Sequence, residues 1–198
     1  MDWTTLWSTF GLLFIAELGD KTQLAVITQT CRYRRPWAVF AGASLALAAV
    51  SGVGVLAGQL AGWLIPGQWI RWIAGAGFVV MGLLLAREAW KKEPEEGPAC
   101  QEEASTVCSP GRVFGSTFLL LALAEMGDKT QLAVFARASE SGRPWAVLIG
   151  AVAALAAVTA LGVVGGQGLV RVVPERWLHR IAAVAFVVMG ILIAAGVL

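Results

Sequence analysis

Long apolar segments separated by short polar ones dominate the pattern of this chain. Six segments are apolar over roughly 20 residues or more, the length that a helix needs to cross a bilayer. None alternates apolar and polar residues with a period of two, the pattern of a transmembrane barrel strand. We therefore predict an all-α integral membrane protein with six spans, at about 5–29, 37–64, 69–90, 113–137, 145–170 and 177–197.

The composition supports this prediction. Hydrophobic residues make up 58% of the 198 residues and charged residues only 14%, and the mean hydropathy is +0.72. A soluble domain of this size carries more charge on its surface. Because no basic cluster is interleaved with aromatic residues, we expect membrane lipid as a partner and no nucleic acid.

The second half of the chain repeats the first at an offset of 108 residues without a gap. The matching blocks are Glu17–Gln23 with Glu125–Gln131, Arg35–Val39 with Arg143–Val147, and Phe78–Gly82 with Phe186–Gly190. We predict a three-helix repeat at 1–90, an acidic linker at 91–111 and a second three-helix repeat at 112–198. Three helices are an odd number, so the second repeat should enter the membrane from the opposite face, as an inverted-topology repeat.

Basic residues set the expected orientation, because loops rich in lysine and arginine stay in the cytoplasm. Both termini should then face outside and the acidic linker should be cytoplasmic. The richer side holds Arg32, Arg34, Arg35, Arg87, Lys91, Lys92, Arg112, Arg171, Arg176 and Arg180, and the poorer side holds Arg71, Arg137 and Arg143.

One charged hexapeptide occurs twice, near the middle of the first and fourth predicted spans. The first motif, E-L-G-D-K-T, is Glu17–Thr22, and the second motif, E-M-G-D-K-T, is Glu125–Thr130. Ionisable residues at that depth are costly and mark functional sites. Residues three apart share a helix face, so each motif aims two carboxylates at one spot. The predicted cation ligands are Glu17, Asp20, Glu125 and Asp128, with further oxygens from Thr22, Thr130, Gln23 and Gln131.

The charges of the two motifs predict what the site binds. Four carboxylates repel one another in a low dielectric, and Lys21 and Lys129 balance only part of that charge. A divalent cation neutralises the rest, or two protons do so when the metal is absent. All-oxygen coordination suits hard cations such as Ca²⁺, Mn²⁺ and Mg²⁺. We therefore predict cation/proton exchange, with no enzymatic activity and no resident cofactor.

The motif lysines and the three cysteines each have a further interpretation. Glu17 with Lys21, and Glu125 with Lys129, have the spacing of salt bridges within one helix. The three cysteines fit no close zinc spacing, and we expect free thiols at Cys31, Cys100 and Cys108. A metal-sensing role for the last two stays open.

The duplicated pattern E-x-G-D-[KR]-[TS], in a six-helix chain with an acidic central loop, resembles the GDT-type divalent cation/proton exchanger family. Bacterial members of that family include manganese exporters of the MneA type. The resemblance covers nearly the whole chain. It implies transport of Mn²⁺ or Ca²⁺ coupled to protons, with Glu17, Asp20, Glu125 and Asp128 as ligands and with Thr22 and Thr130 assisting.

We therefore expect a multi-pass secondary transporter of the bacterial inner membrane that exports Mn²⁺ from the cytoplasm in exchange for protons. A Ca²⁺/proton exchanger of the same architecture is the close alternative. A divalent cation channel with a carboxylate ring, a membrane scaffold and an exporter of small organic solutes are further alternatives. The sequence leaves open whether the protein forms a homo-oligomer.

Overall fold

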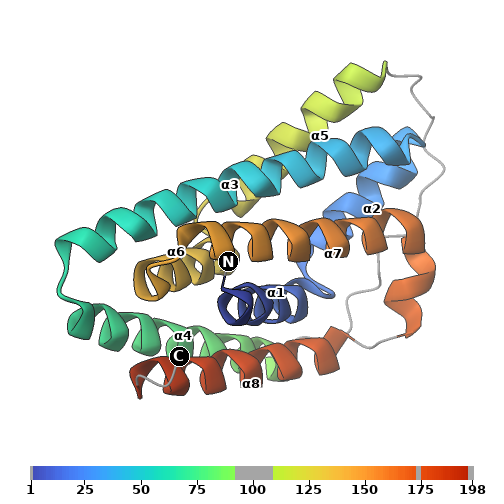
Figure 1. Cartoon of the computed structure of the whole chain (residues 1–198). Coiled ribbons are helices and arrows are strands. Elements are labelled where there is room, and N and C mark those ends of the chain that lie inside the picture. The colour runs from blue at the N-terminus through green and yellow to red at the C-terminus, as the bar shows by residue number, and fades with distance from the viewer. Residues whose placement is uncertain (1, 92–108, 173–174, 196–198) are drawn as a thin grey trace.

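The computed structural model describes residues 2–91, 109–172 and 175–195, and this part of the chain is helical without a strand. It contains eight helices, whose arrangement is shown in Figure 1. They are α1 (Trp3–Glu17), α2 (Lys21–Tyr33), α3 (Pro36–Leu64), α4 (Gly67–Lys91), α5 (Pro110–Glu125), α6 (Lys129–Ser141), α7 (Pro144–Val172) and α8 (Glu175–Ala194).

Two of the predicted spans are each broken into two helices. The segment 5–29 forms α1 and α2, and the segment 113–137 forms α5 and α6. Gly19 and Gly127 lie in the breaks with φ angles of 80° and 87°, a left-handed conformation that glycine adopts at little cost. Asp20 and Asp128 follow as extended N-caps. The prediction of one continuous helix was wrong here, because the apolar pattern continues across a break that one backbone angle creates.

The two longest helices, α3 and α7, form the centre of the bundle. Each has 29 residues and they pack against each other, α3 also against α5 and α6, and α7 also against α1 and α2. A Cβ added at Gly42 of α3 would lie 2.6 Å from the carbonyl oxygen of Phe114, and one at Gly150 of α7 would lie 2.6 Å from that of Leu6. These four residues form two pairs related by the offset of 108, so the two crossings have matching contacts.

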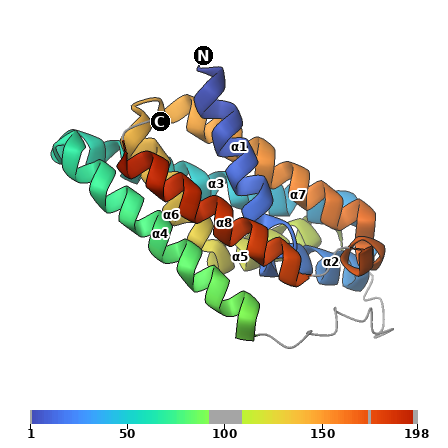
Figure 2. The same cartoon turned by 90° about the horizontal axis from the view of Figure 1, so that it is seen from below.

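Helices α4 and α8 form a close antiparallel pair, and they lie side by side in Figures 1 and 2. A Cβ added at Gly75 would lie 2.8 Å from the carbonyl oxygen of Gly190, and one at Gly82 would lie 2.8 Å from that of Ala183. Small residues allow this close backbone approach between membrane helices. Within this pair, α8 packs against α1 and α4 packs against α6.

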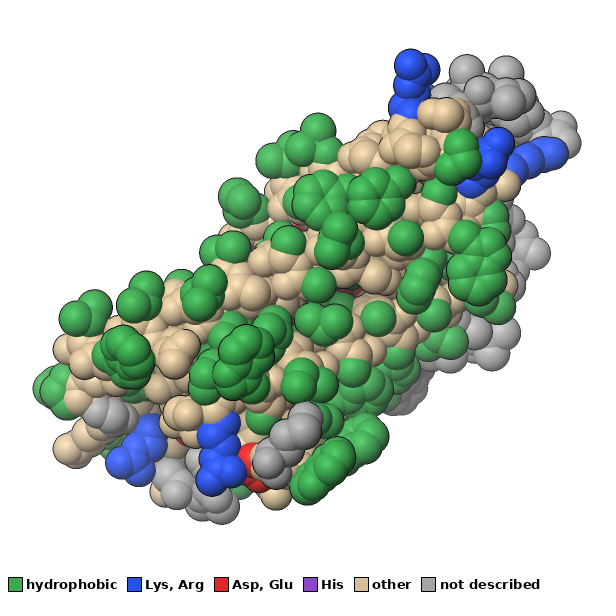
Figure 3. All heavy atoms as spheres, turned by 45° about the horizontal axis from the view of Figure 1, so that its top comes forward, with side chains coloured by type: hydrophobic (Ala, Val, Ile, Leu, Met, Phe, Trp, Pro, Cys, Tyr) green, Lys and Arg blue, Asp and Glu red, His purple; other side chains and the backbone are tan. Residues whose placement is uncertain are grey.

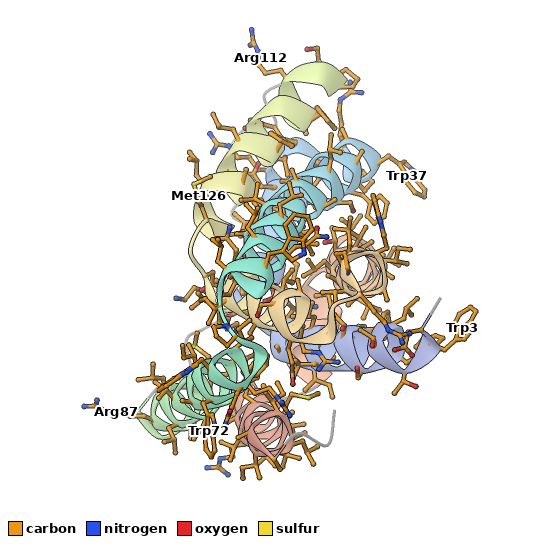
Figure 4. The ribbon with its side chains drawn as sticks, turned by 60° about the vertical axis from the view of Figure 1, so that its left-hand side comes forward. Trp3, Trp37, Trp72, Arg87, Arg112 and Met126 are labelled. Atoms are coloured by element: carbon orange, nitrogen blue, oxygen red, sulfur yellow. The ribbon has the colours of Figure 1, made fainter. Side chains whose placement is uncertain are left out.

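The outer surface of the bundle suits a membrane. Among the described residues, Pro36–Leu64, Gln68–Arg87 and Pro144–Gly165 are long and apolar enough to span a bilayer, and Arg180–Ala194 is a shorter apolar helix. Figure 3 shows hydrophobic side chains over much of one face, with lysine and arginine side chains toward its ends. Trp3 and Trp37 project outward near helix starts in Figure 4, as expected at a membrane interface.

Candidate metal centre

A glutamine side chain forms the same local hydrogen bond at the break in each motif. The backbone N–H of Gly19 donates to Oε1 of Gln23 at 2.7 Å, and the N–H of Gly127 donates to Oε1 of Gln131 at 2.6 Å. The two motifs therefore form the same turn. Both glutamine oxygens were predicted cation ligands, but in this structure each accepts a hydrogen bond from the backbone.

The breaks bring carboxylates from both halves of the chain together. Glu17 ends α1, Glu125 ends α5 and Asp128 precedes α6. One oxygen from each of these three residues lies within 4.8 Å of the other two. Glu17 is fully buried and Glu125 is 4% exposed. This is a spacing at which one cation can contact all three carboxylates, and their oxygens suit a hard divalent cation.

The threonines of the motifs hold the glutamates across the interface between the halves. The hydroxyl of Thr22 donates to Oε1 of Glu125, and the hydroxyl of Thr130 donates to Oε1 of Glu17. The second oxygen of each glutamate is buried and has no hydrogen-bond partner in the described part of the chain. A buried carboxylate oxygen without a partner is unfavourable, which leaves one oxygen of each glutamate suited to a ligand.

Asp20 is not a member of this three-carboxylate group and interacts instead with a lysine. Its Oδ2 forms an ion pair with Nζ of Lys129 at 2.7 Å, and both side chains are less than a tenth exposed. The alternative of salt bridges within one helix does not describe this contact, because the helix breaks between Glu17 and Lys21 and the pair joins opposite halves. Lys21 is exposed.

A buried charged cluster, not predicted from the sequence, lies at the end of α6. Arg137 is only 3% exposed, donates to the hydroxyl of Ser8 at 2.8 Å and pairs with Glu140 at 3.4 Å. One oxygen of Glu140 is buried without a partner in the described residues. Arg137 follows Thr130 by seven residues, two helical turns on the same face, and this spacing is the signal that the sequence offered.

Two further features bear on earlier expectations. An apolar cavity beside the centre is lined by α3, α4, α6 and α8, and Lys129 is the only charged residue among its described lining residues. The described lining of this cavity therefore offers no carboxylate to a cation. Cys31 is disulfide-bonded, so the expectation of a free thiol there was wrong; Cys100 and Cys108 lie outside the described residues.

Comparisons with known proteins identify the family of the chain. A family model described as divalent cation/proton antiporter GDT1 matches residues 5–93 and 113–197. A GDT1-like protein of Synechocystis sp. is 30% identical over 191 residues, which cover 90% of this chain and 91% of that protein. GDT1-like protein 5 of Oryza sativa is 25% identical over 93% of this chain and 91% of its own length.

A candidate manganese exporter of Vibrio cholerae is 29% identical over 119 residues, 60% of this chain and 54% of that protein. No solved structure matches the chain. The family model covers both motifs and nearly all of the described helices. The chain therefore belongs to the GDT1 family of divalent cation/proton antiporters.

Proposed function

We propose that this antiporter exports Mn²⁺ from the cytoplasm in exchange for protons, and that the cation binds among Glu17, Glu125 and Asp128. The observation that carries the proposal is the pair of buried glutamate oxygens without partners, one from each half of the chain, within reach of a third carboxylate. The metal ion is cargo, protons are the coupling ions, and the chain has no resident cofactor and no enzymatic activity.

The proposed architecture has six spans, in which α1 with α2 and α5 with α6 each form one broken span. Residues 1–90 and 112–198 are then inverted repeats around the cation, and the linker 91–111 faces the cytoplasm of a bacterial inner membrane. Broken helices line the substrate sites of many transporters, because freed backbone groups are tolerated only beside a cavity or inside protein. The contacts that recur at the offset of 108 support this arrangement.

The centre also explains why protons would be exchanged. Carboxylates buried this close together repel one another strongly unless a positive charge lies between them. The ion pair of Lys129 with Asp20 leaves the other three carboxylates to be neutralised. A divalent cation offsets two of these three negative charges in one state, and protons take its place when the cation leaves.

Transport by purified protein in liposomes tests the proposal. We expect Mn²⁺ uptake to move protons in the opposite direction, followed by a pH dye inside the vesicles. The double substitution Glu17→Gln plus Glu125→Gln should reduce both fluxes by at least about tenfold, because removing direct ligands costs no less than removing their supporting groups. Asp2→Asn is the matched control, since Asp2 is a carboxylate at the start of α1, where it pairs with Arg143.

Two outcomes contradict the proposal. Metal flux without coupled protons indicates a channel or uniporter, which cannot drive protons against their gradient. Unchanged flux in the double glutamine variant places transport outside this centre.

Ca²⁺ is the second candidate cargo, because the carboxylate and hydroxyl oxygens of the centre suit Ca²⁺ as well as Mn²⁺. Competition decides between them. Excess external Ca²⁺ should inhibit Mn²⁺ uptake weakly if Mn²⁺ is the cargo, and strongly, with its own proton exchange, if Ca²⁺ is.

A further inference from the structure

The two motifs differ in how their lysines are used, although their sequences are nearly the same. Lys129 of the second motif is buried and contacts Asp20 of the first motif at 2.7 Å. The equivalent residues are Lys21 and Asp128. Lys21 is exposed, Asp128 is half-buried, and they form no ion pair in the described part of the chain. The pairing is therefore one-sided.

This one-sided pairing divides the four acidic residues of the motifs. Glu17, Glu125 and Asp128 have oxygens within 4.8 Å of one another. The carboxylate of Asp20 is held by an ammonium group, which competes with a cation for its oxygen. A buried ion pair of this kind needs its partner, because breaking it leaves an uncompensated charge. Lys129 thus competes with a bound cation for Asp20.

The packing of α4 and α8 is one-sided in the same sense. Helix α8 packs against α1, and α4 packs against α6. The equivalents at the offset of 108 would be α4 against α5 and α8 against α2, and neither is among the substantial helix contacts of the described residues. The crossings of α3 with α5 and of α7 with α1, in contrast, match closely. The crossings of α3 and α7 are therefore symmetric, whereas the lysine pairing and the position of the α4–α8 pair are not.

If each one-sided contact is replaced by its equivalent in the other half of the chain, a second arrangement results that contains the same kinds of contact. In that arrangement α4 and α8 pack against α5 and α2, and Lys21 pairs with Asp128. An antiporter needs two states of this kind, since its site opens to one face at a time.

We propose that Lys129 and Lys21 are positioning residues that withdraw Asp20 and Asp128 from the cation in turn. Glu17 and Glu125 bind the cation in both states, and a different aspartate joins them at each face of the membrane. This inference rests on the proposed function. It assigns each aspartate to cation binding at one face of the membrane. It also pairs each lysine with the aspartate of the other half of the chain.

Face-resolved transport tests the inference. The protein is reconstituted in one orientation, and half-saturating Mn²⁺ is measured separately at the internal and external faces. Asp128→Asn should raise the Mn²⁺ concentration for half-maximal transport by about tenfold or more at one face and change it little at the other. Asp20→Asn should do the same at the opposite face. Glu17→Gln and Glu125→Gln, measured singly, should weaken binding at both faces.

A paired substitution guards against misfolding. Asp20→Asn leaves the ammonium of Lys129 buried without its partner, which is destabilising in itself. The double variant Asp20→Asn plus Lys129→Gln removes both charges and should show the same face preference as Asp20→Asn. Lys129→Arg keeps the positive charge and should behave like the wild type at both faces.

The outcomes separate this inference from the proposed function. If flux depends on both glutamates but Asp20→Asn and Asp128→Asn weaken both faces equally, the site has four fixed ligands and the alternation is wrong. If wild-type flux is absent or independent of Glu17 and Glu125, the proposed function fails and the alternation fails with it. Opposite face preferences for the two aspartate variants support the alternation.

Discussion

The first and second motifs have nearly the same sequence and form the same turn, yet their surroundings differ. The turns share a glycine with positive φ and a glutamine that accepts from its N–H. Lys129 is buried against Asp20, whereas Lys21 is exposed. Farther along, Arg137 is buried with Glu140, whereas the equivalent residue in the first half is Gln29.

This comparison shows which part of the site is local and which part depends on the fold. The turn is set by residues within one heptapeptide, so both copies form it. The ion pair of Lys129 with Asp20 joins opposite halves of the chain, and the Arg137–Glu140 pair, although within α6, is buried where Arg137 contacts Ser8 of α1. Both therefore depend on how helices from the two halves pack, and the α4–α8 pair does not pack alike on the two halves.

The largest expected effect comes from making the second half resemble the first at the buried arginine. Arg137→Gln introduces the residue of the first half and leaves Glu140 buried without its partner. Removing one member of a buried ion pair costs about 3–5 kcal/mol of unfolding free energy, measured as thermal unfolding in detergent. The double variant Arg137→Gln plus Glu140→Gln should recover most of that loss. A loss no larger than that of an exposed substitution would show that the cluster is not a stabilising pair.

An intermediate effect is expected at the two matching helix crossings. Gly42→Ala and Gly150→Ala each place a Cβ 2.6 Å from a backbone oxygen, and overpacking of this kind costs about 1–3 kcal/mol. The two losses should be equal if the crossings are equivalent. Gly52→Ala, in the same helix as Gly42 but with nothing within 4 Å, is the control and should be neutral or stabilising. If thermal unfolding shows unequal losses of stability for the two variants, the two crossings are alike in sequence but not in packing.

The smallest expected effect is on cation affinity through the cross-half hydroxyls. Thr22→Val frees an oxygen of Glu125, and Thr130→Val frees one of Glu17. Each should weaken Mn²⁺ binding by about tenfold, as for other groups that orient metal ligands, measured by competition with a fluorescent chelator. Serine at either position keeps the hydroxyl and should restore affinity. Thr28→Val, an exposed threonine of α2, should leave binding unchanged, and a similar loss there would contradict the assignment.

The sequence predicted much of this molecule because its strongest signals are local or repeated. Apolar segment length indicated the membrane helices, and the offset from Glu17 to Glu125 indicated one centre built from two halves. The resemblance carried by the motifs indicated the family, which the family model confirmed.

The remaining features depend on single angles or on distant contacts. Gly19 lies within the first predicted span, and the pattern of neighbouring apolar residues does not reveal that its φ becomes positive and ends the helix. The pairing of Lys129 with Asp20 joins residues far apart in the chain, and helical spacing favoured partners four residues away instead. The burial of Arg137 depends on α1 lying beside α6, and its spacing from Thr130 alone does not encode that contact.

The contact between α4 and α8 has a consequence for how such a chain could arise. Gly75 meets Gly190 while Gly82 meets Ala183, and Phe78 meets Phe186 with ring centroids 5.5 Å apart. The offset of 108 relates Phe78 to Phe186, so that contact is its own equivalent. The same offset converts the contact of Gly75 with Gly190 into the contact of Ala183 with Gly82. That is the pattern of an interface between two identical subunits. An ancestor with half this length would have made the same contact as a homodimer, and joining two copies in one chain would have needed no new interface.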